Sequence, residues 1–85
     1  MSGPPRSALE LQPERIANGS DEEGLLVRAD GRLVAVLVRL SETHDSLAGA
    51  WFLEIGFHPG LAGNPVFEDL DAAQAWIADR VLAPA

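Results

Sequence analysis

The sequence predicts an α+β domain in two layers: an antiparallel meander sheet of three to four strands with one C-terminal helix packed on one face. Three observations predict it. First, an Asp-Gly pair separates two apolar runs at residues 24–29 and 32–40. Second, a run that alternates between bulky and other residues follows at 50–57. Third, apolar residues with helical spacing form a stripe at 70–81. With 85 residues, the chain is long enough for one such domain and no more.

The first part of the chain, residues 1–21, is expected to form an arm, and residues 22–85 are expected to form the single domain. Residues 1–7 read MSGPPRS, which is small, Pro-rich and unpatterned, as is typical of a disordered terminus. Pro13 and Asn18-Gly19 stand where a short helix would begin and end, because Pro is favoured in the first helical turn and Gly just after the last.

The clearest local signal is a β-hairpin that turns at Asp30-Gly31, since both residues of a type I′ turn need a positive φ. A two-residue loop also fixes the register, so that Arg28 lies opposite Leu33 and shares its face. The face then expected under the helix carries Leu25, Val27, Val34, Val36, Val38 and Leu40. The opposite face carries Leu26, Arg28, Leu33, Ala35, Leu37 and Arg39.

The next strand, AWFLEIGF at residues 50–57, alternates between bulky and mixed positions. Its bulky set is expected to face the helix and consists of Trp51, Leu53, Ile55 and Phe57. Its other set is expected to face away and consists of Phe52, Glu54 and Gly56. Polar loops flank the strand at 41–49 and 58–65, and residues 66–67 are expected to add a short fourth strand.

The last element is predicted to be an amphipathic helix that starts after Asp69, because an N-cap Asp accepts a hydrogen bond from a free backbone N–H. Asp71 in the first turn and Arg80 near the end both suit the helix dipole, and Pro84 stops the helix. The buried stripe is expected to contain Leu70, Ala73, Ile77 and Val81, with Trp76 on its flank.

The sheet face turned away from this helix is apolar as well, and it raises the functional question. An apolar centre with a charged rim is the anatomy of a protein interface. The candidate interface residues are Leu26, Leu33, Ala35, Leu37, Arg39, Phe52 and Glu54. We expect a homodimer or another partner there. Two alternatives stay open: the arm folds over this face through Leu9, Leu11 and Ile16, or scattered apolar residues simply face water.

The composition argues against several classes of function. The chain has 13 acidic residues against 6 arginines, with no lysine, and its net charge of −7 repels the phosphate backbone of nucleic acids. Such an acidic surface suits a basic protein partner better. No apolar run approaches the roughly 20 residues that span a bilayer, and the N-terminus lacks a signal-peptide pattern. We therefore expect a cytoplasmic protein that binds neither nucleic acid nor membrane.

Residue types suited to catalysis are present but poorly arranged. His44 and His58 flank the strand at 50–57 and lie about 25 Å apart at ~3.3 Å per residue, which is too far for one metal ion. Ser41 and three residues suited to catalysis lie together in one loop, and these three are His44, Asp45 and Ser46. This loop lacks the rigid scaffold that a catalytic triad needs. The chain has neither a glycine-rich phosphate loop nor a cysteine. We therefore expect no enzymatic activity, no cofactor and no metal.

A small-ligand site near Asp30 and His58 stays open as an alternative. The turn at Asp30 and the loop that begins at His58 follow neighbouring strands and meet at the same end of the predicted sheet. Either Glu68 or Asp69 could join them there. His58 could equally belong to an ordinary His-Pro-Gly turn.

The ending VFEDLDAAQAWI resembles that of many small bacterial domains, with a Phe-containing strand, an N-cap and an aromatic-aliphatic pair within a helix. Over residues 24–82, the order of elements is similar at the level of fold to HicB-like antitoxin domains and other double-stranded-RNA-binding-like β-β-β-α modules. This resemblance implies a toxin-neutralising role. GLAGNP stands where HicB-like domains carry Pro-Asp-Leu-Pro-Gly, and no functional residue is carried over.

The leading hypothesis is therefore a small non-enzymatic interaction module that forms a homodimer through the outer sheet face. The first alternative is an acidic regulator of antitoxin type that binds a basic protein. The second is a small-ligand site near Asp30 and His58.

Overall fold

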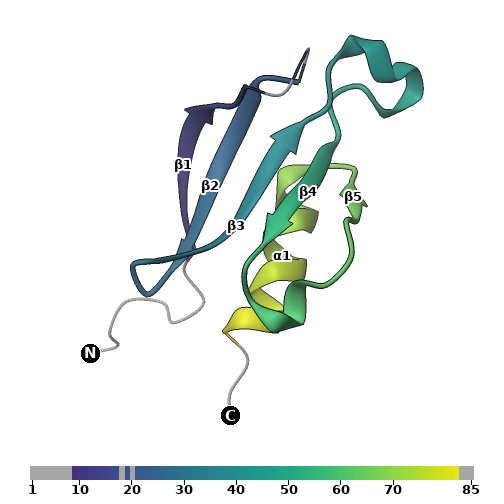
Figure 1. Ribbon diagram of the computed structural model, residues 1–85. Coiled ribbons are helices and arrows are strands. Elements are labelled where there is room, and N and C mark those ends of the chain that lie inside the picture. Colours follow the sequence, from purple (N-terminus) through teal and green to yellow (C-terminus); the bar gives the residue numbers. More distant parts are fainter. Residues whose placement is uncertain (1–8, 18, 20, 83–85) are drawn as a thin grey trace.

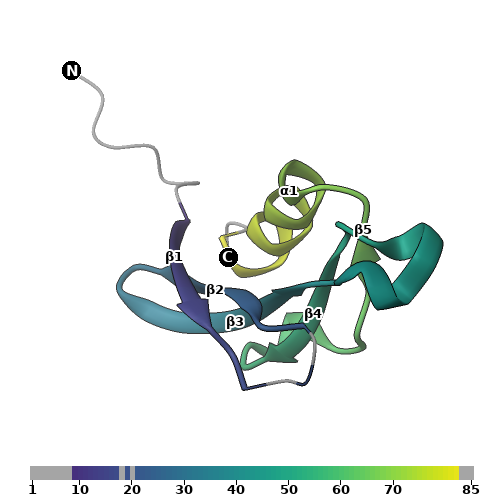
Figure 2. The same ribbon diagram turned by 90° about the horizontal axis from the view of Figure 1, so that it is seen from above.

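The computed structural model describes residues 9–17, 19 and 21–82, except for the side chains of residues 43 and 44. The elements are β1 (Glu10–Arg15), β2 (Glu23–Ala29), β3 (Arg32–Arg39), η1 (Glu42–Leu47), β4 (Trp51–Gly56), η2 (Pro59–Leu61), β5 (Val66–Phe67) and α1 (Leu70–Val81). The strands form one antiparallel sheet in chain order, and α1 covers one of its faces (Figures 1 and 2). The predicted α+β class is confirmed, with five strands rather than three or four. Within the described part of the chain, no helix is long and apolar enough to cross a membrane.

The additional strand is β1, which lies in the segment that we expected to be an arm. It pairs with β2 from Glu10 opposite Arg28 to Arg15 opposite Glu23, so the short helix expected to begin at Pro13 is wrong. Proline is tolerated in a sheet almost only on an edge strand, where no neighbour needs its missing N–H. β1 is such an edge, so the domain includes these residues rather than beginning at residue 22. The predicted disorder of residues 1–7 concerns residues outside the described part.

The Asp30-Gly31 turn is confirmed, with φ of 54° and 77° at its two residues. Arg28 lies opposite Leu33 as expected, but the next pair joins Val27 to Ala35. Val34 is therefore an extra residue in β3, which is a β-bulge. Because side chains alternate with a period of two, this one-residue shift reverses the faces of the rest of β3.

A second β-bulge lies in β4. Val36 is opposite Ile55 and Leu37 is opposite Leu53, which leaves Glu54 as the extra residue. The predicted faces hold for Trp51 and Leu53, which are buried, but fail beyond the bulge. The side chains of Ile55 and Phe57, which we expected under the helix, are 45% and 58% exposed.

The core fills the space between α1 and the sheet. Its members are Leu25, Val27, Ala29, Val34, Ala35, Leu37, Trp51, Leu53, Leu61, Phe67, Ala73 and Ile77. Leu9 and Leu11 pack against this cluster. The predicted N-cap is confirmed, since the carboxylate of Asp69 accepts a hydrogen bond from Ala72 N at 2.8 Å. At the core's edge, the Trp76 ring packs on Phe67 with centroids 5.5 Å apart.

Candidate interface on the outer sheet face

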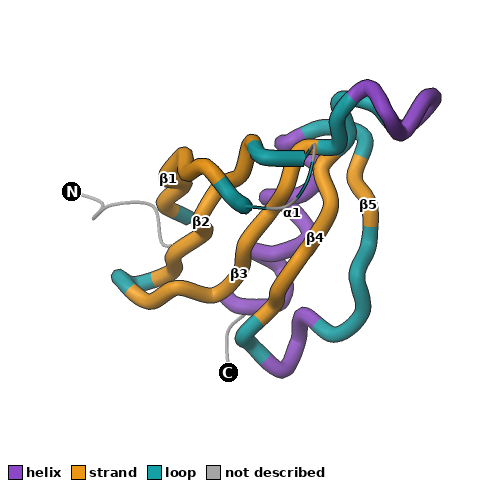
Figure 3. The backbone as a smooth tube through the Cα atoms, turned by 45° about the horizontal axis from the view of Figure 1, so that its top comes forward, coloured by secondary structure: helices purple, strands orange, loops and turns teal. Residues whose placement is uncertain are grey.

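The outer face is the side of the sheet that α1 does not cover, and it faces the viewer in Figure 3. The strand register assigns its apolar residues. They are Leu26, Leu33, Val36, Val38, Phe52, Ile55 and Val66. The ladder continues one residue beyond β4, because Phe57 N donates to Val34 O at 2.8 Å, and alternation places Phe57 on this face too.

One end of the outer face is covered by the chain itself. The two ends of the connection from β1 to β2 are held together by a hydrogen bond from Ile16 N to Glu22 O at 2.7 Å. Ile16 sits against Gly24, where an added Cβ would overlap its side chain. Asp21 in the same connection accepts a hydrogen bond from Ser41 N at 2.8 Å. Of the arm residues proposed as a cover, Ile16 therefore takes that role, whereas Leu9 and Leu11 are partly buried and pack against the core.

Toward β4 and β5 the outer face is open, whereas Val36 and Val38 on β3 are buried, with exposures of 8% and 0%. Ile55, Phe57 and Val66 are 45%, 58% and 42% exposed, and among the described residues Leu47 is the one other large apolar side chain that is exposed to a similar degree. Leu26 and Phe52 beside them are half-buried. At strand spacings of about 4.8 Å and a rise of about 3.3 Å per residue, this area measures about 400 Å² in projection. This is the size of the largest apolar patch on a typical monomer, about 300–600 Å², and such a patch is often functional.

Charged residues border this patch unevenly. Alternation along β1 places Glu10, Gln12 and Glu14 on the outer face, so the β1 side is acidic. Arg28 lies on the same face and has no ion-pair partner within the described residues. Glu54 is the unpaired extra residue of the bulge in β4 and is half-buried.

The predicted interface residues divide into two groups. Three of them, Leu26, Leu33 and Phe52, lie on the outer face, and Glu54 is the extra residue of the bulge in β4. Ala35 and Leu37 were wrongly assigned, because the bulge at Val34 turns both into the core, where each is fully buried. Arg39 follows the same shift to the helix side, and its exposed guanidinium pairs with Glu23 at 3.2 Å.

The interpretation of the sequence missed five outer-face residues, which are Val36, Val38, Ile55, Phe57 and Val66. The first four are displaced by the two bulges, which carry no local signal in this sequence. Val66 could have been assigned, since Phe67 follows it directly and points into the core.

Both sheet edges are protected against pairing with another strand. Pro13 and several exposed charged residues occupy the β1 edge. At the other edge β5 is two residues long, and the Asn64 side chain donates to Leu53 O at 2.8 Å and to Glu54 O at 3.3 Å. Association through an added strand is therefore disfavoured.

The second candidate site, near Asp30 and His58, is a hollow. These two residues, together with Arg32, Val34 and Val81, line a space of about 420 Å³. His58 Nδ1 accepts a hydrogen bond from Gly60 N at 2.9 Å, so the neutral ring carries its proton on Nε2. Glu68 and Asp69, which we expected to join this group, do not line the hollow, because they precede α1 at its opposite end.

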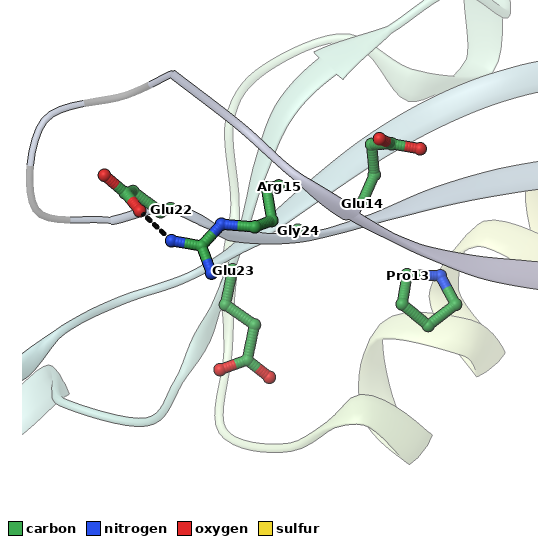
Figure 4. A pocket seen from close by; sticks show the side chains of 6 residues that line it. All are labelled: Pro13, Glu14, Arg15, Glu22, Glu23 and Gly24. Atoms are coloured by element: carbon green, nitrogen blue, oxygen red, sulfur yellow. Dashed lines mark hydrogen bonds and ion pairs between the residues drawn. The ribbon is translucent and has the colours of Figure 1, made fainter.

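A further hollow of about 690 Å³ lies between the end of β1 and the start of β2 (Figure 4). The Arg15 guanidinium donates a hydrogen bond to the Glu22 carboxylate at 2.5 Å, and the two side chains form an ion pair across the mouth of the hollow. The Arg15 side chain is 85% exposed, so this pair adds little to stability.

Comparison with protein-family models, with curated proteins and with solved structures finds no match for this chain. The resemblance to HicB-like antitoxin domains therefore stays a prediction.

Proposed function

We propose that this protein is a non-enzymatic interaction module that forms a homodimer through its outer sheet face. The observation that carries the proposal is the gathering of Ile55, Phe57 and Val66, all substantially exposed, on the one face that α1 leaves open. We place its action in the cytoplasm, without nucleic acid or membrane as a partner, in keeping with its net charge of −7.

The expected affinity is modest. Full burial of a side chain of this size is worth about 1.5–3 kcal/mol, so each half-exposed residue contributes about 1 kcal/mol in each copy. Two patches of about 400 Å² each bury about 800 Å² in all, which is below the roughly 1,200–2,000 Å² of specific stable interfaces and is typical of weak association. After the cost of association, we expect a dissociation constant of about 1–100 μM.

Light scattering coupled to size exclusion tests the proposal with two matched variants. Ile55→Glu places a carboxylate within the apolar patch and should yield a folded monomer at concentrations where the parent is a dimer. Leu47→Glu makes the same change on η1, at a side chain that is 47% exposed, and should keep the parent's mass. The proposal is wrong if Ile55→Glu keeps the parent's mass, or if both variants lose it equally.

In the antitoxin-type alternative, a basic protein occupies the same face. It predicts that such a protein co-purifies with the parent from its native host and is lost with Ile55→Glu. A native purification that recovers only this chain argues for the homodimer.

The hollow near Asp30 favours a second candidate function, binding of a small polar molecule. Arg32 and the His58 Nε2–H offer donors, Asp30 offers acceptors, and Val34 and Val81 supply an apolar wall. Titration with a panel of small metabolites, followed by amide NMR shifts, should move Arg32 and Gly60 together if the hollow binds a ligand. Shifts scattered over the whole surface would exclude a specific site.

A further inference from the structure

The hollow beside the turn between β2 and β3 is built from three segments that are far apart in the sequence. The turn contributes Asp30 and Arg32, the N-cap of η2 contributes His58, and the end of α1 contributes Val81. These segments lie at the same end of the molecule (Figure 1). The hollow measures about 420 Å³, which is within the range of about 300–1,000 Å³ that is typical of small-molecule sites.

The hollow lies on the helix side of the sheet. Arg32 is opposite Ala29, and residues that are directly opposite share a face. Ala29 belongs to the core under α1, so Arg32 projects toward the helix side as well. The hollow is therefore separate from the outer face and from the proposed dimer contact.

The hollow presents one positive and one negative side chain that do not neutralise each other. Arg32 and Asp30 both line it, and both are exposed. Within residues 9–17, 19 and 21–82, neither of them takes part in an ion pair. A ligand that carries both charges can pair with each of these side chains.

Two further groups add a donor and acceptors. His58 Nδ1 accepts a hydrogen bond from Gly60 N at 2.9 Å, which orients the ring and leaves its Nε2–H as a donor. Gly60 lies against the last turn of α1, since an added Cβ would be 3.3 Å from Arg80 Cβ and 3.5 Å from Arg80 O. The last carbonyls of a helix lack helical partners and carry a partial negative charge, which suits a cation. The Arg80 guanidinium is engaged elsewhere, because it lies 3.9 Å from the centroid of the Trp76 ring.

The balance of charge selects the class of ligand. An anion such as phosphate would meet Asp30, the carbonyl end of α1 and a chain of net charge −7. A cation without an acidic group would meet Arg32. A molecule that carries one ammonium and one carboxylate complements both sides of the hollow, and the net charge of the chain does not repel it.

The floor of the hollow is apolar and small. Ala29 and Val34 line it with exposures of 7% and 9%, and Val81 beside them is half-buried. An α-amino acid carries its ammonium, its carboxylate and one side chain on the same carbon atom. A short aliphatic side chain can therefore rest on this floor while the two charged groups reach Asp30 and Arg32.

Resting on the second candidate function, the binding of a small polar molecule in this hollow, we propose that the ligand is a free α-amino acid with a short aliphatic side chain. Arg32 and the His58 Nε2–H bind its carboxylate, whereas Asp30 and the carbonyls at the end of α1 bind its ammonium. Because the charged groups of the site are exposed to solvent, we expect a dissociation constant of about 1 mM.

Amide NMR titration of the full chain with L-valine tests this assignment, and two blocked derivatives serve as further probes. N-acetyl-L-valine lacks the ammonium, and L-valinamide lacks the carboxylate. L-valine should shift the amides of Arg32 and Gly60 along one saturating curve. Each derivative should bind about three- to tenfold more weakly, because it loses one of the two charge pairs.

Three variants assign the charged groups. Asp30→Asn keeps the turn, because Asn-Gly suits the same turn type, and should weaken L-valine about three- to tenfold without weakening N-acetyl-L-valine. Arg32→Gln should weaken L-valine to a similar extent without weakening L-valinamide. Arg28→Gln is the matched control, because Arg28 lies opposite Leu33 on the outer face, and it should keep the parent's midpoint.

The outcomes separate this inference from the functions proposed above. A derivative that binds as tightly as L-valine overturns the amino-acid assignment, and so does an Arg28→Gln that weakens binding as much as Arg32→Gln. If L-valine gives no saturable shift at about 50 mM while another metabolite of the panel moves Arg32 and Gly60, the assignment is wrong and the second candidate function stands. No shift with any member of the panel overturns both. The homodimer is tested separately, because its proposed contact lies on the other face of the sheet.

Discussion

Replacement of Leu37 by Glu tests whether the strands pair in the register of the structure or in the register expected without bulges. In the unbulged register Leu37 lies on the outer face, and Leu37→Glu gives a folded monomer. In the structure Leu37 is opposite Leu25 and Leu53 in the core and is completely buried. The change should then unfold the protein rather than dissociate it.

The magnitude follows from burial. Removal of a buried Leu side chain to Ala costs about 2.7–5 kcal/mol, and an unpaired buried carboxylate adds several more. At roughly 0.05–0.15 kcal/mol per residue, a chain of 85 residues has about 4–13 kcal/mol of stability in total. Leu37→Glu therefore removes most or all of it. Leu37→Ala should remain folded and lose roughly 10–30 °C in melting temperature.

Far-UV circular dichroism with thermal melting is the assay, and Leu26→Glu is the matched control. Leu26 lies on the neighbouring strand but on the outer face, where it is half-buried. This control should keep a cooperative transition near that of the parent. A folded Leu37→Glu with the parent's melting temperature would refute the register and both bulges.

Three further substitutions test particular contacts. Gly56→Ala should cost about 1–3 kcal/mol in a denaturant melt, because its Cβ would lie 2.7 Å from Leu61 Cβ and 2.8 Å from Leu61 O; an unchanged midpoint would contradict this packing. Asp69→Ala removes the hydrogen bond to Ala72 N and should lower stability by about 1 kcal/mol, with Asp69→Asn largely restoring it. Glu54→Gln removes a carboxylate next to Ile55 and should tighten the proposed dimer several-fold in sedimentation equilibrium, whereas weaker association would mean that Glu54 pairs with a cation across the interface.

Much of the fold is dictated by local chemistry that can be recognised in the sequence. Asp30-Gly31 must turn because few other pairs accept two positive φ angles in succession. The helix begins after Asp69 because that side chain satisfies a backbone N–H that would otherwise be unpaired. Such features depend on neighbouring residues only, so they are visible without the rest of the chain.

The two bulges could not be recognised from neighbouring residues in this way. Val34 sits within an unbroken apolar run, in which either register buries similar side chains, and tertiary packing under α1 decides between them. Glu54 interrupts a strand whose alternation is otherwise regular, so the pattern assigned Ile55 and Phe57 to the wrong face. The location of the candidate interface was therefore predictable, but only part of its membership was.

Because β1 is polar and contains Pro13, it carries little strand signal of its own and is defined by pairing with β2.

The most direct measurement of the central claim is sedimentation equilibrium of the parent chain over a dilution series from about 1 μM to about 1 mM. The outer-face homodimer predicts a weight-average mass that rises from the 9.0 kDa of one chain to twice that value, with a midpoint of about 1–100 μM. A mass that stays at 9.0 kDa throughout would contradict it and would mean that Ile55, Phe57 and Val66 face water or await a different partner.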